Sequence, residues 1–125
     1  MLTIEEDCGA ELCTVCRASG ELDAFTVGQM RESLARLSTS RRLVIDLSGV
    51  PFVDSVGLGA LVGGIRRVRD HGGDVVLACN RPILLRILRM TNIDRIVTVA
   101  TTVDEATAAF ELGEPSQPPL TLQLQ

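Results

Sequence analysis

Aromatic residues are scarce in this sequence: three of the 125 residues are phenylalanine, and tryptophan and tyrosine are absent. The hydrophobic core is therefore predicted to be aliphatic. Proteins bind single-stranded nucleic acids by stacking the bases on aromatic side chains, and the formal net charge of −4 disfavours contact with phosphate backbones. Both features argue against a nucleic-acid partner.

Long hydrophobic runs are also missing. No apolar stretch approaches the ~20 residues that a membrane-spanning helix needs. Residues 5–7 are all acidic, whereas a secretory signal would have basic residues followed by an apolar stretch. The hydrophobic fraction of 46% and the charged fraction of 22% are ordinary for a soluble globular protein. We therefore expect one domain in the cytoplasm, with no membrane partner.

Residues that commonly bind metals are few, with one histidine and four cysteines. Cys8, Cys13 and Cys16 have the C-x4-C-x2-C spacing of plant-type ferredoxins, and Cys79 follows far downstream. Residues 12–19, however, are predicted to form a strand in which Cys13 and Cys16 point to opposite faces. No cysteine or histidine near Cys79 completes a zinc site. We expect no metal site and buried thiols without disulfides, as in a reducing compartment; redox control of the thiols is the alternative.

The hydrophobic pattern alternates between strands and helices along the chain. Strands are predicted at residues 2–6, 12–19, 43–47, 75–79 and 96–99, and helices are predicted to begin near residues 26, 55, 82 and 102. This β-β-α-β-α-β-α-β-α order indicates an α/β domain with a small mixed sheet, parallel central strands and an N-terminal antiparallel hairpin turning at residues 7–10. We assign residues 1–112 to the domain and residues 113–125 to a Pro/Gln-rich tail.

Helix ends carry recognisable signals. Thr26 stands three residues before Gln29, and Thr102 three residues before Glu105, which is the spacing of a capping box. The glycines at residues 72–73 are placed to end the second helix.

Glycines inside the second helix each cost roughly 1 kcal/mol relative to alanine. One interpretation is that Gly57, Ala60 and Gly64 form a small-residue face against the sheet. Gly59 and Gly63 fall elsewhere on the helix, where they would keep an exposed surface flat.

The central stretch, residues 43–64, places a serine at a chemically useful point. Its apolar strand is followed by turn residues, and Asp54 and Ser55 then precede the glycine-rich helix. Both residue types are favoured at helix N-caps, so we predict Ser55 at a helix N-terminus with its hydroxyl at the mouth of a loop.

Four interpretations of Ser55 follow from the residues themselves. A hydrolase nucleophile is disfavoured, because Val53 replaces the first glycine of G-x-S-x-G and His71 lies about 24 Å away along the helix. Residues 57–59 begin like G-x-G-x-x-G, but Val62 replaces the third glycine, so only weak nucleotide binding at the helix N-terminus stays open. A plain helix cap and a regulatory phosphorylation site are the remaining two.

Residues 53–59, Val-Asp-Ser-Val-Gly-Leu-Gly, resemble the signature of STAS domains, specifically that of bacterial anti-sigma factor antagonists. Residues 20–23 are similar to the G-E-[LI]-D loop of the same family. Two further stretches, residues 71–73 and 88–93, resemble segments that end its helices. The resemblance implies the STAS fold with four helices, and a regulatory protein rather than an enzyme, without a catalytic residue or a cofactor.

In that family, an anti-sigma factor with a histidine-kinase-like ATP-binding fold phosphorylates the serine that follows the aspartate. A metal-dependent phosphatase removes the phosphate, and the unphosphorylated antagonist binds the anti-sigma factor and frees the sigma factor. By resemblance, Ser55 is the phosphorylated residue. Many members have Ser or Thr at the next position, where this chain has Val56, so the site offers a single hydroxyl.

The resemblance also implies a partner-binding surface that consists of Glu21, Asp23, Asp54, Ser55, Val56, Gly57, Leu58 and Gly59. The alternative function is a STAS interaction module that binds another regulatory or transport partner without being phosphorylated.

Overall fold

The computed structural model describes residues 1–8 and 13–111. Its helices and strands are, in chain order, β1 (Thr3–Cys8), β2 (Cys13–Ser19), α1 (Val27–Arg36), β3 (Arg42–Gly49), α2 (Ser55–Asp70), β4 (Asp74–Ala78), α3 (Pro82–Met90), the 3-10 helix η1 (Ile93–Arg95), β5 (Thr98–Ala100) and α4 (Val103–Glu111). The predicted order of elements is confirmed. The centre of the hairpin turn and the tail lie outside the described residues.

The five strands that the structure describes form one sheet in the order β1-β2-β3-β4-β5. Strand β1 is antiparallel to β2, and each of the remaining neighbours is parallel, so the predicted mixed sheet is confirmed. Strands β3 and β4 have nearly continuous apolar sequences because both of their faces are buried. Along β3, for example, Leu43 and Ile45 enter one hydrophobic cluster and Val44 enters the other.

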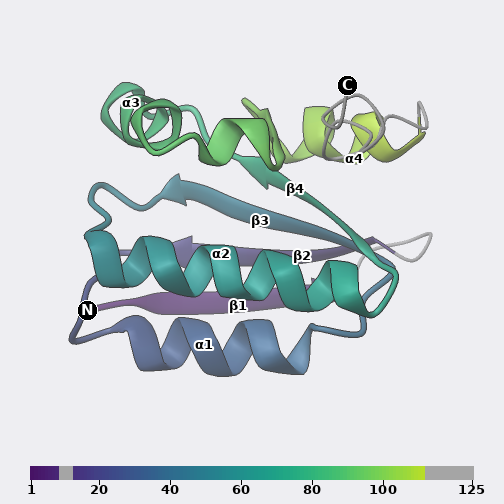
Figure 1. Ribbon diagram of the computed structural model, residues 1–125, viewed down its shortest axis with the longest axis horizontal. Helices are drawn as coiled ribbons and strands as arrows, with labels where there is room; N and C mark the ends of the chain where they lie inside the picture. Colours follow the sequence, from purple (N-terminus) through teal and green to yellow (C-terminus); the bar gives the residue numbers. More distant parts are fainter. Residues whose placement is uncertain (9–12, 112–125) are drawn as a thin grey trace, which may run out of the picture.

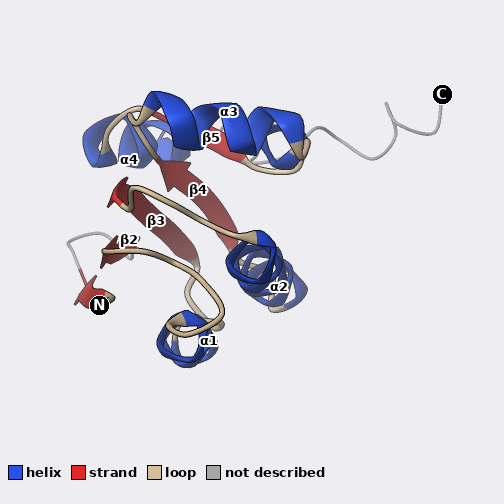
Figure 2. Cartoon of the chain, turned by 90° about the vertical axis from the view of Figure 1, so that its left-hand side faces the viewer, coloured by secondary structure: helices blue, strands red, loops and turns tan. Residues whose placement is uncertain are grey.

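Helices cover both faces of the sheet (Figures 1 and 2). The strands follow one another across the sheet in one direction, and right-handed crossovers then place α1 and α2 side by side on the same face. Helix α4 packs on the opposite face against β3, β4 and β5. Helix α3 contributes Leu84 and Leu88 to the cluster beneath α1 and α2. None of the helices described is both long enough and apolar enough to cross a membrane.

The last strand differs from the prediction. The sequence places a strand at residues 96–99, but η1 occupies Ile93–Arg95 and β5 begins at Thr98. Asn92 has a left-handed backbone (φ 61°) that ends α3, and the chain then makes a tight turn. Within that turn Ile93 and Val97 are both buried, four residues apart, so part of the apolar run follows a helical spacing.

Thr26 is the N-cap residue of α1 as predicted, but the predicted capping box does not form. The Thr26 side chain makes no capping hydrogen bond to α1, because its hydroxyl bonds within the preceding loop. At α4, Thr102 Oγ1 accepts a hydrogen bond from Glu105 N at 3.1 Å, but the Glu105 carboxylate bonds to Thr101 and completes no reciprocal box. The predicted end of α2 is confirmed, since Gly72 has a φ of 84°.

The two cysteines of β2 point to opposite faces, as predicted: Cys13 lies in the cluster under α4 and Cys16 in the cluster under α1 and α2. Cys16 Sγ lies 3.6 Å from Ser33 Oγ, and Ser33 Oγ donates to Glu6 Oε2 at 2.6 Å. Burial raises the pKa of the Cys16 thiol, so it stays protonated. Hydrogen bonds from Arg36 and Ser33 lower the pKa of Glu6. This cluster joins β1, β2 and α1.

Candidate partner-binding site

Two loops meet at the carboxyl ends of the parallel strands, on the side that faces the viewer in Figure 2. One loop follows β2 and contains Leu22; the other follows β3 and contains Phe52 and Val53. Leu22 N donates to Phe52 O at 3.0 Å, and Asp54 N donates to Leu22 O at 3.2 Å. The side chains of Leu22 and Val53, which form a parallel bridge, are buried. The two loops are therefore one connected layer above the core.

Asp54 fastens this layer to α2. Its Oδ1 accepts a hydrogen bond from Gly57 N at 2.9 Å, which caps the helix, and its Oδ2 accepts one from Ala24 N at 3.1 Å. Because the backbone of Asp54 is extended (φ −93°, ψ −177°), Asp54 is the N-cap and Ser55 is the first helical residue. The interpretation of Ser55 as the cap is therefore wrong. Ser55 is exposed and does not carry the capping contact.

Asp23 organises the loop from within. Its Oδ1 accepts hydrogen bonds from Phe25 N at 2.9 Å and from Thr26 N at 3.1 Å. Thr26 Oγ1 donates to Glu21 O at 2.8 Å, which explains why it does not cap α1. Asp23 is half-buried, whereas Glu21 is exposed. The predicted binding residue Asp23 thus also fixes the conformation of the surface to which it belongs.

The glycines at the start of α2 have two different surroundings. A Cβ at Gly57 would stand 2.6 Å from Leu22 O, so only glycine lets the helix lie this close to the loop. A Cβ at Gly59 would have no atom within 4 Å, and Gly59 is exposed as predicted. Of the neighbouring predicted residues, Val56 is 38% exposed and Leu58 is partly buried. Gly57 is buried and sets how closely α2 approaches the loop.

The predicted small-residue face of α2 does not rest on the sheet along its length. A Cβ at Gly64 would stand 2.5 Å from Cδ1 of Leu34, a residue of α1. The physical reason is that α1 and α2 lie side by side in one layer, so the second contact surface of α2 is a helix. Ala60 and Gly64 are both buried.

Two exposed aromatic side chains at this site were missed from the sequence. Phe25 is 96% exposed and Phe52 is 47% exposed, while Phe110, a residue of α4, is 5% exposed and packs in the cluster between that helix and the sheet. Aromatic residues suggest core positions, and the sequence contains no pattern of spacing that identifies a lone exposed phenylalanine. The available signal is that Phe25 stands in a polar loop, between Asp23 and Thr26, outside any periodic segment.

Three carboxylates, those of Glu21, Asp23 and Asp54, lie on the loops that flank the exposed Ser55 hydroxyl. His71 is the C-cap of α2 and stands at the far end of that helix from Ser55, so it cannot act as a base for this hydroxyl. In the described part of the chain, no group of three or more His, Cys, Asp or Glu side chains could hold a metal ion.

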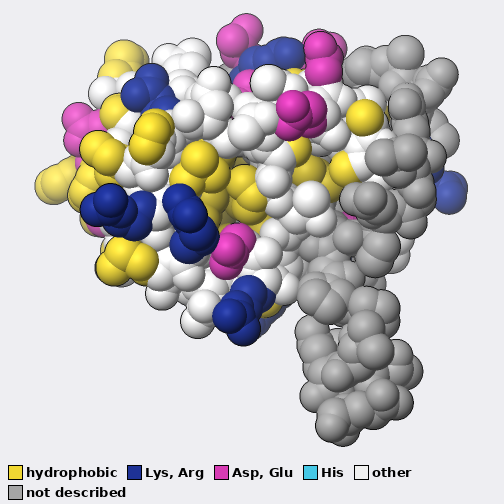
Figure 3. Space-filling view, turned by 90° about the horizontal axis from the view of Figure 1, so that it is seen from above, with side chains coloured by type: hydrophobic (Ala, Val, Ile, Leu, Met, Phe, Trp, Pro, Cys, Tyr) yellow, Lys and Arg dark blue, Asp and Glu magenta, His cyan; other side chains and the backbone are white. Residues whose placement is uncertain are grey.

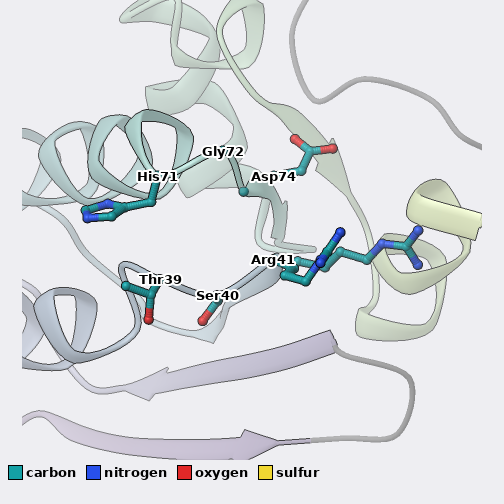
Figure 4. Close-up of a pocket in the computed structure, with 8 residues that line it drawn as sticks. Thr39, Ser40, Arg41, His71, Gly72 and Asp74 are labelled. Atoms are coloured by element: carbon teal, nitrogen blue, oxygen red, sulfur yellow. The ribbon is translucent and has the colours of Figure 1, made fainter.

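A hollow lies at the opposite end of α2. It has a volume of about 490 Å³ and is lined by polar residues that include Thr39, Arg41, His71 and Asp74. Figure 4 shows His71 and Arg41 projecting in opposite directions from it. The His71 ring contacts Arg67 O at 2.8 Å, and Asp74 Oδ1 accepts from Val75 N at 2.9 Å. The polar groups do not converge on one point, so we place the candidate site at Ser55.

The fold and the Ser55 loop identify the class of protein. Residues 3–106 match the STAS domain family, and the chain belongs to that family. The resemblance noted in the sequence is confirmed.

Similar proteins within the family include several that are named anti-sigma factor antagonists. The chain is 31% identical over 83 residues to the "Anti-sigma-B factor antagonist" of Listeria monocytogenes, which covers 65% of this chain and 73% of that protein. A crystal structure of an anti-sigma factor antagonist from Mycobacterium paratuberculosis has a TM-score of 0.80 and 26% identity, covering 87% of this chain and 93% of that one. The phosphorylated form of Bacillus SpoIIAA shares the fold, with a TM-score of 0.67 and 21% identity over 86% of this chain and 99% of that chain.

Proposed function

We propose that this chain is an anti-sigma factor antagonist controlled by phosphorylation of Ser55. Its unphosphorylated form binds an anti-sigma factor that has a histidine-kinase-like ATP-binding fold, and this binding frees the sigma factor. The anti-sigma factor phosphorylates Ser55, and a metal-dependent phosphatase reverses the reaction. The observation that carries the proposal is the exposed Ser55 hydroxyl at the first position of α2, fixed beside the 20–26 loop by Asp54.

Phosphorylation would alter the surface more than the fold. A phosphate adds about −1.5 to −2 charges at neutral pH. The N-terminus of a helix stabilises negative charge, so α2 tolerates the modification at its first residue. A partner surface fitted to a neutral hydroxyl would instead face this charge together with those of Asp54, Asp23 and Glu21. Like charges brought together at an interface cost several kcal/mol, and binding is lost.

The proposed activity is binding, in the cytoplasm, and not catalysis. Listeria and mycobacterial relatives that are named anti-sigma factor antagonists support this function. Val56 supports Ser55 as the only acceptor at the site, because the next residue has no hydroxyl.

Titration calorimetry against purified anti-sigma factors of the source organism tests the proposal. Phosphorylated Ser55 is expected to bind at least ~100-fold more weakly than the unmodified protein, since each 1.4 kcal/mol is about tenfold in affinity. Ser55→Asp should reproduce part of this loss because it adds one charge. Ser55→Ala should bind like the wild type but accept no phosphate.

Two results would contradict the switch. Equal affinities of the wild type and the phosphorylated protein would favour an interaction module that is not regulated by phosphate. Kinase labelling of Ser55→Ala at the wild-type level would place the phosphate on another residue.

A further inference from the structure

Exposed large hydrophobic side chains gather at the end of the molecule that carries Ser55. Phe25, Phe52 and Val56 are 96%, 47% and 38% exposed. Ile83 and Met90, 69% and 74% exposed, are on α3, which lies over the same end in Figure 1. Seen from above, hydrophobic side chains are present at this left-hand end, next to Lys and Arg side chains, and they continue across the middle of the face (Figure 3). Exposed large hydrophobic side chains that gather at one end of a small domain point to an interaction site.

The two exposed phenylalanines are stronger evidence for an interaction surface at this end than the exposed aliphatic residues are. The chain contains only three, and the two that are not in the core, Phe25 and Phe52, stand on the two loops that meet beside Ser55. The bridge between Leu22 and Val53 explains the exposure of Phe52. Because side chains alternate along an extended chain, Phe52 points outward when Val53 points into the core.

Phe25 is presented on a rigid backbone. Its own N–H donates to Asp23 Oδ1 at 2.9 Å, and the N–H of the preceding residue, Ala24, donates to Asp54 Oδ2 at 3.1 Å. Thr26 N, on the other side, also donates to Asp23 Oδ1. A loop that is already ordered loses little backbone entropy when a partner covers it. The side chain is free of intramolecular packing while its backbone is fixed, as a preorganised binding residue requires.

We propose that Phe25 is the apolar anchor of the partner-binding surface, inserted into an apolar pocket of the anti-sigma factor with Phe52 and Val56 alongside it. This inference rests on the proposed function. It names the residue that contributes most to the affinity for the anti-sigma factor, and it describes the partner surface that this residue contacts. The pocket is apolar, and its rim carries basic or hydrogen-bond-donating groups that face Glu21, Asp23 and the Ser55 hydroxyl. Buried aromatic anchors with a polar rim are the usual hot spots of protein interfaces.

The geometry also links the anchor to the phosphorylation site. Asp54 joins the residue before Phe25 to the helix that begins at Ser55, so the spacing between anchor and hydroxyl is fixed. A phosphate on Ser55 would therefore stand at the edge of the pocket that holds Phe25, where water is excluded and charge repulsion is strongest.

Binding of Phe25 variants to a panel of purified histidine-kinase-like anti-sigma factors from the source organism tests this inference. Phe25→Ala should bind at least about 30-fold more weakly than the wild type, the loss typical of an anchor residue. Phe25→Leu should retain most of the affinity, and Phe25→Gln, of similar length but polar, should lose as much as alanine. The melting temperature should be unchanged in all three, since the side chain is 96% exposed.

The matched control is Arg66→Ala, which removes a long exposed side chain from the same helix that carries Ser55, about 16 Å further along its axis at 1.5 Å per residue. Its affinity should stay within about twofold of the wild type, since substitutions outside an interface centre change binding little.

Three outcomes would overturn the inference, and they are distinguishable. If the wild type binds no member of the panel, the proposed function fails and the anchor fails with it. If the wild type binds and Phe25→Ala binds equally well, the function stands and the anchor is wrong. If the wild type is a dimer in sedimentation and Phe25→Ala is a monomer, the pocket belongs to a second copy of this chain.

Discussion

The two ends of α2 present polar residues in opposite ways. At the Ser55 end, the carboxylates of Asp23 and Asp54 accept hydrogen bonds from backbone N–H groups of the 20–26 loop and of the first turn of α2, and Phe25 and Ser55 stay exposed. At the His71 end, there is a hollow of about 490 Å³, but His71 and Asp74 bond to nearby backbone atoms, and His71 and Arg41 project in opposite directions (Figure 4). The surface at the His71 end is therefore the less organised of the two, although it is hollowed.

The difference shows what a protein-binding site of this small domain requires. A fixed backbone and exposed side chains with no internal partner allow a large macromolecule to bind without reordering the loops. Cavity size is a guide to small-molecule sites, in which convergent polar groups fix a ligand. If this comparison is correct, substitutions at the Ser55 end should affect stability and binding in a defined order, and those at the His71 end should leave binding unchanged.

The largest effect on stability is expected at Gly57. Gly57→Ala should lower the free energy of unfolding by about 2 kcal/mol, because its Cβ would stand 2.6 Å from Leu22 O and 2.9 Å from Leu22 Cγ. Gly59→Ala is the matched control: it has open space and should stabilise α2 by up to ~1 kcal/mol. Urea denaturation of both variants measures the difference. Equal shifts of the same sign would show that α2 does not rest on the loop as described.

Asp54 should have the next largest effect. Asp54→Ala removes the N-cap of α2 and the bond to Ala24 N, and it should lower the free energy of unfolding by about 1.5 kcal/mol. Asp54→Asn retains an acceptor oxygen and should lose about half as much. Amide hydrogen exchange gives a second readout: Ala24 N should exchange faster in Asp54→Ala. Unchanged exchange at Ala24 would mean that Asp54 does not join the two loops.

Ser55 should contribute little to stability. Since Asp54 supplies the cap and Ser55 is exposed, Ser55→Ala should change the free energy of unfolding by less than about 0.5 kcal/mol. Thermal unfolding of the unphosphorylated variant provides the measurement. A loss near 1 kcal/mol would return the capping role to Ser55 and contradict the assignment of Asp54.

The smallest effect is expected at the other end of α2. His71→Ala should change the affinity for the anti-sigma factor by less than about twofold, since substitutions remote from an interface centre are nearly neutral. His71 is exposed and bonded to its own helix, about 24 Å from Ser55 along the axis at 1.5 Å per residue. A tenfold loss in the same calorimetric titration would extend the binding surface to the hollow and remove the contrast between the two ends.

Local sequence signals were enough for the framework of the molecule. The apolar runs of β3 and β4 and the helical spacing of α2 depend on residues within a few positions of one another, so periodicity predicts them directly. Alternation along β2 likewise places Cys13 and Cys16 on opposite faces. The position of Ser55 at the start of a helix belongs to the same category, because turn residues and favoured N-cap residues stand next to it in the chain.

Only the tertiary structure showed which residue caps α2 and which residues are exposed beside Ser55. Asp54, and not Ser55, holds the helix end, and the same carboxylate reaches Ala24, which is 30 residues away in the sequence. The contact between Gly64 of α2 and Leu34 of α1 also depends on segments far apart in the chain. The same holds for the exposure of Phe25 and the burial of Phe110. Sequence periodicity records only whether a side chain is suited to the core. Which partners it meets is set by contacts between distant segments, and those exist only in the folded domain.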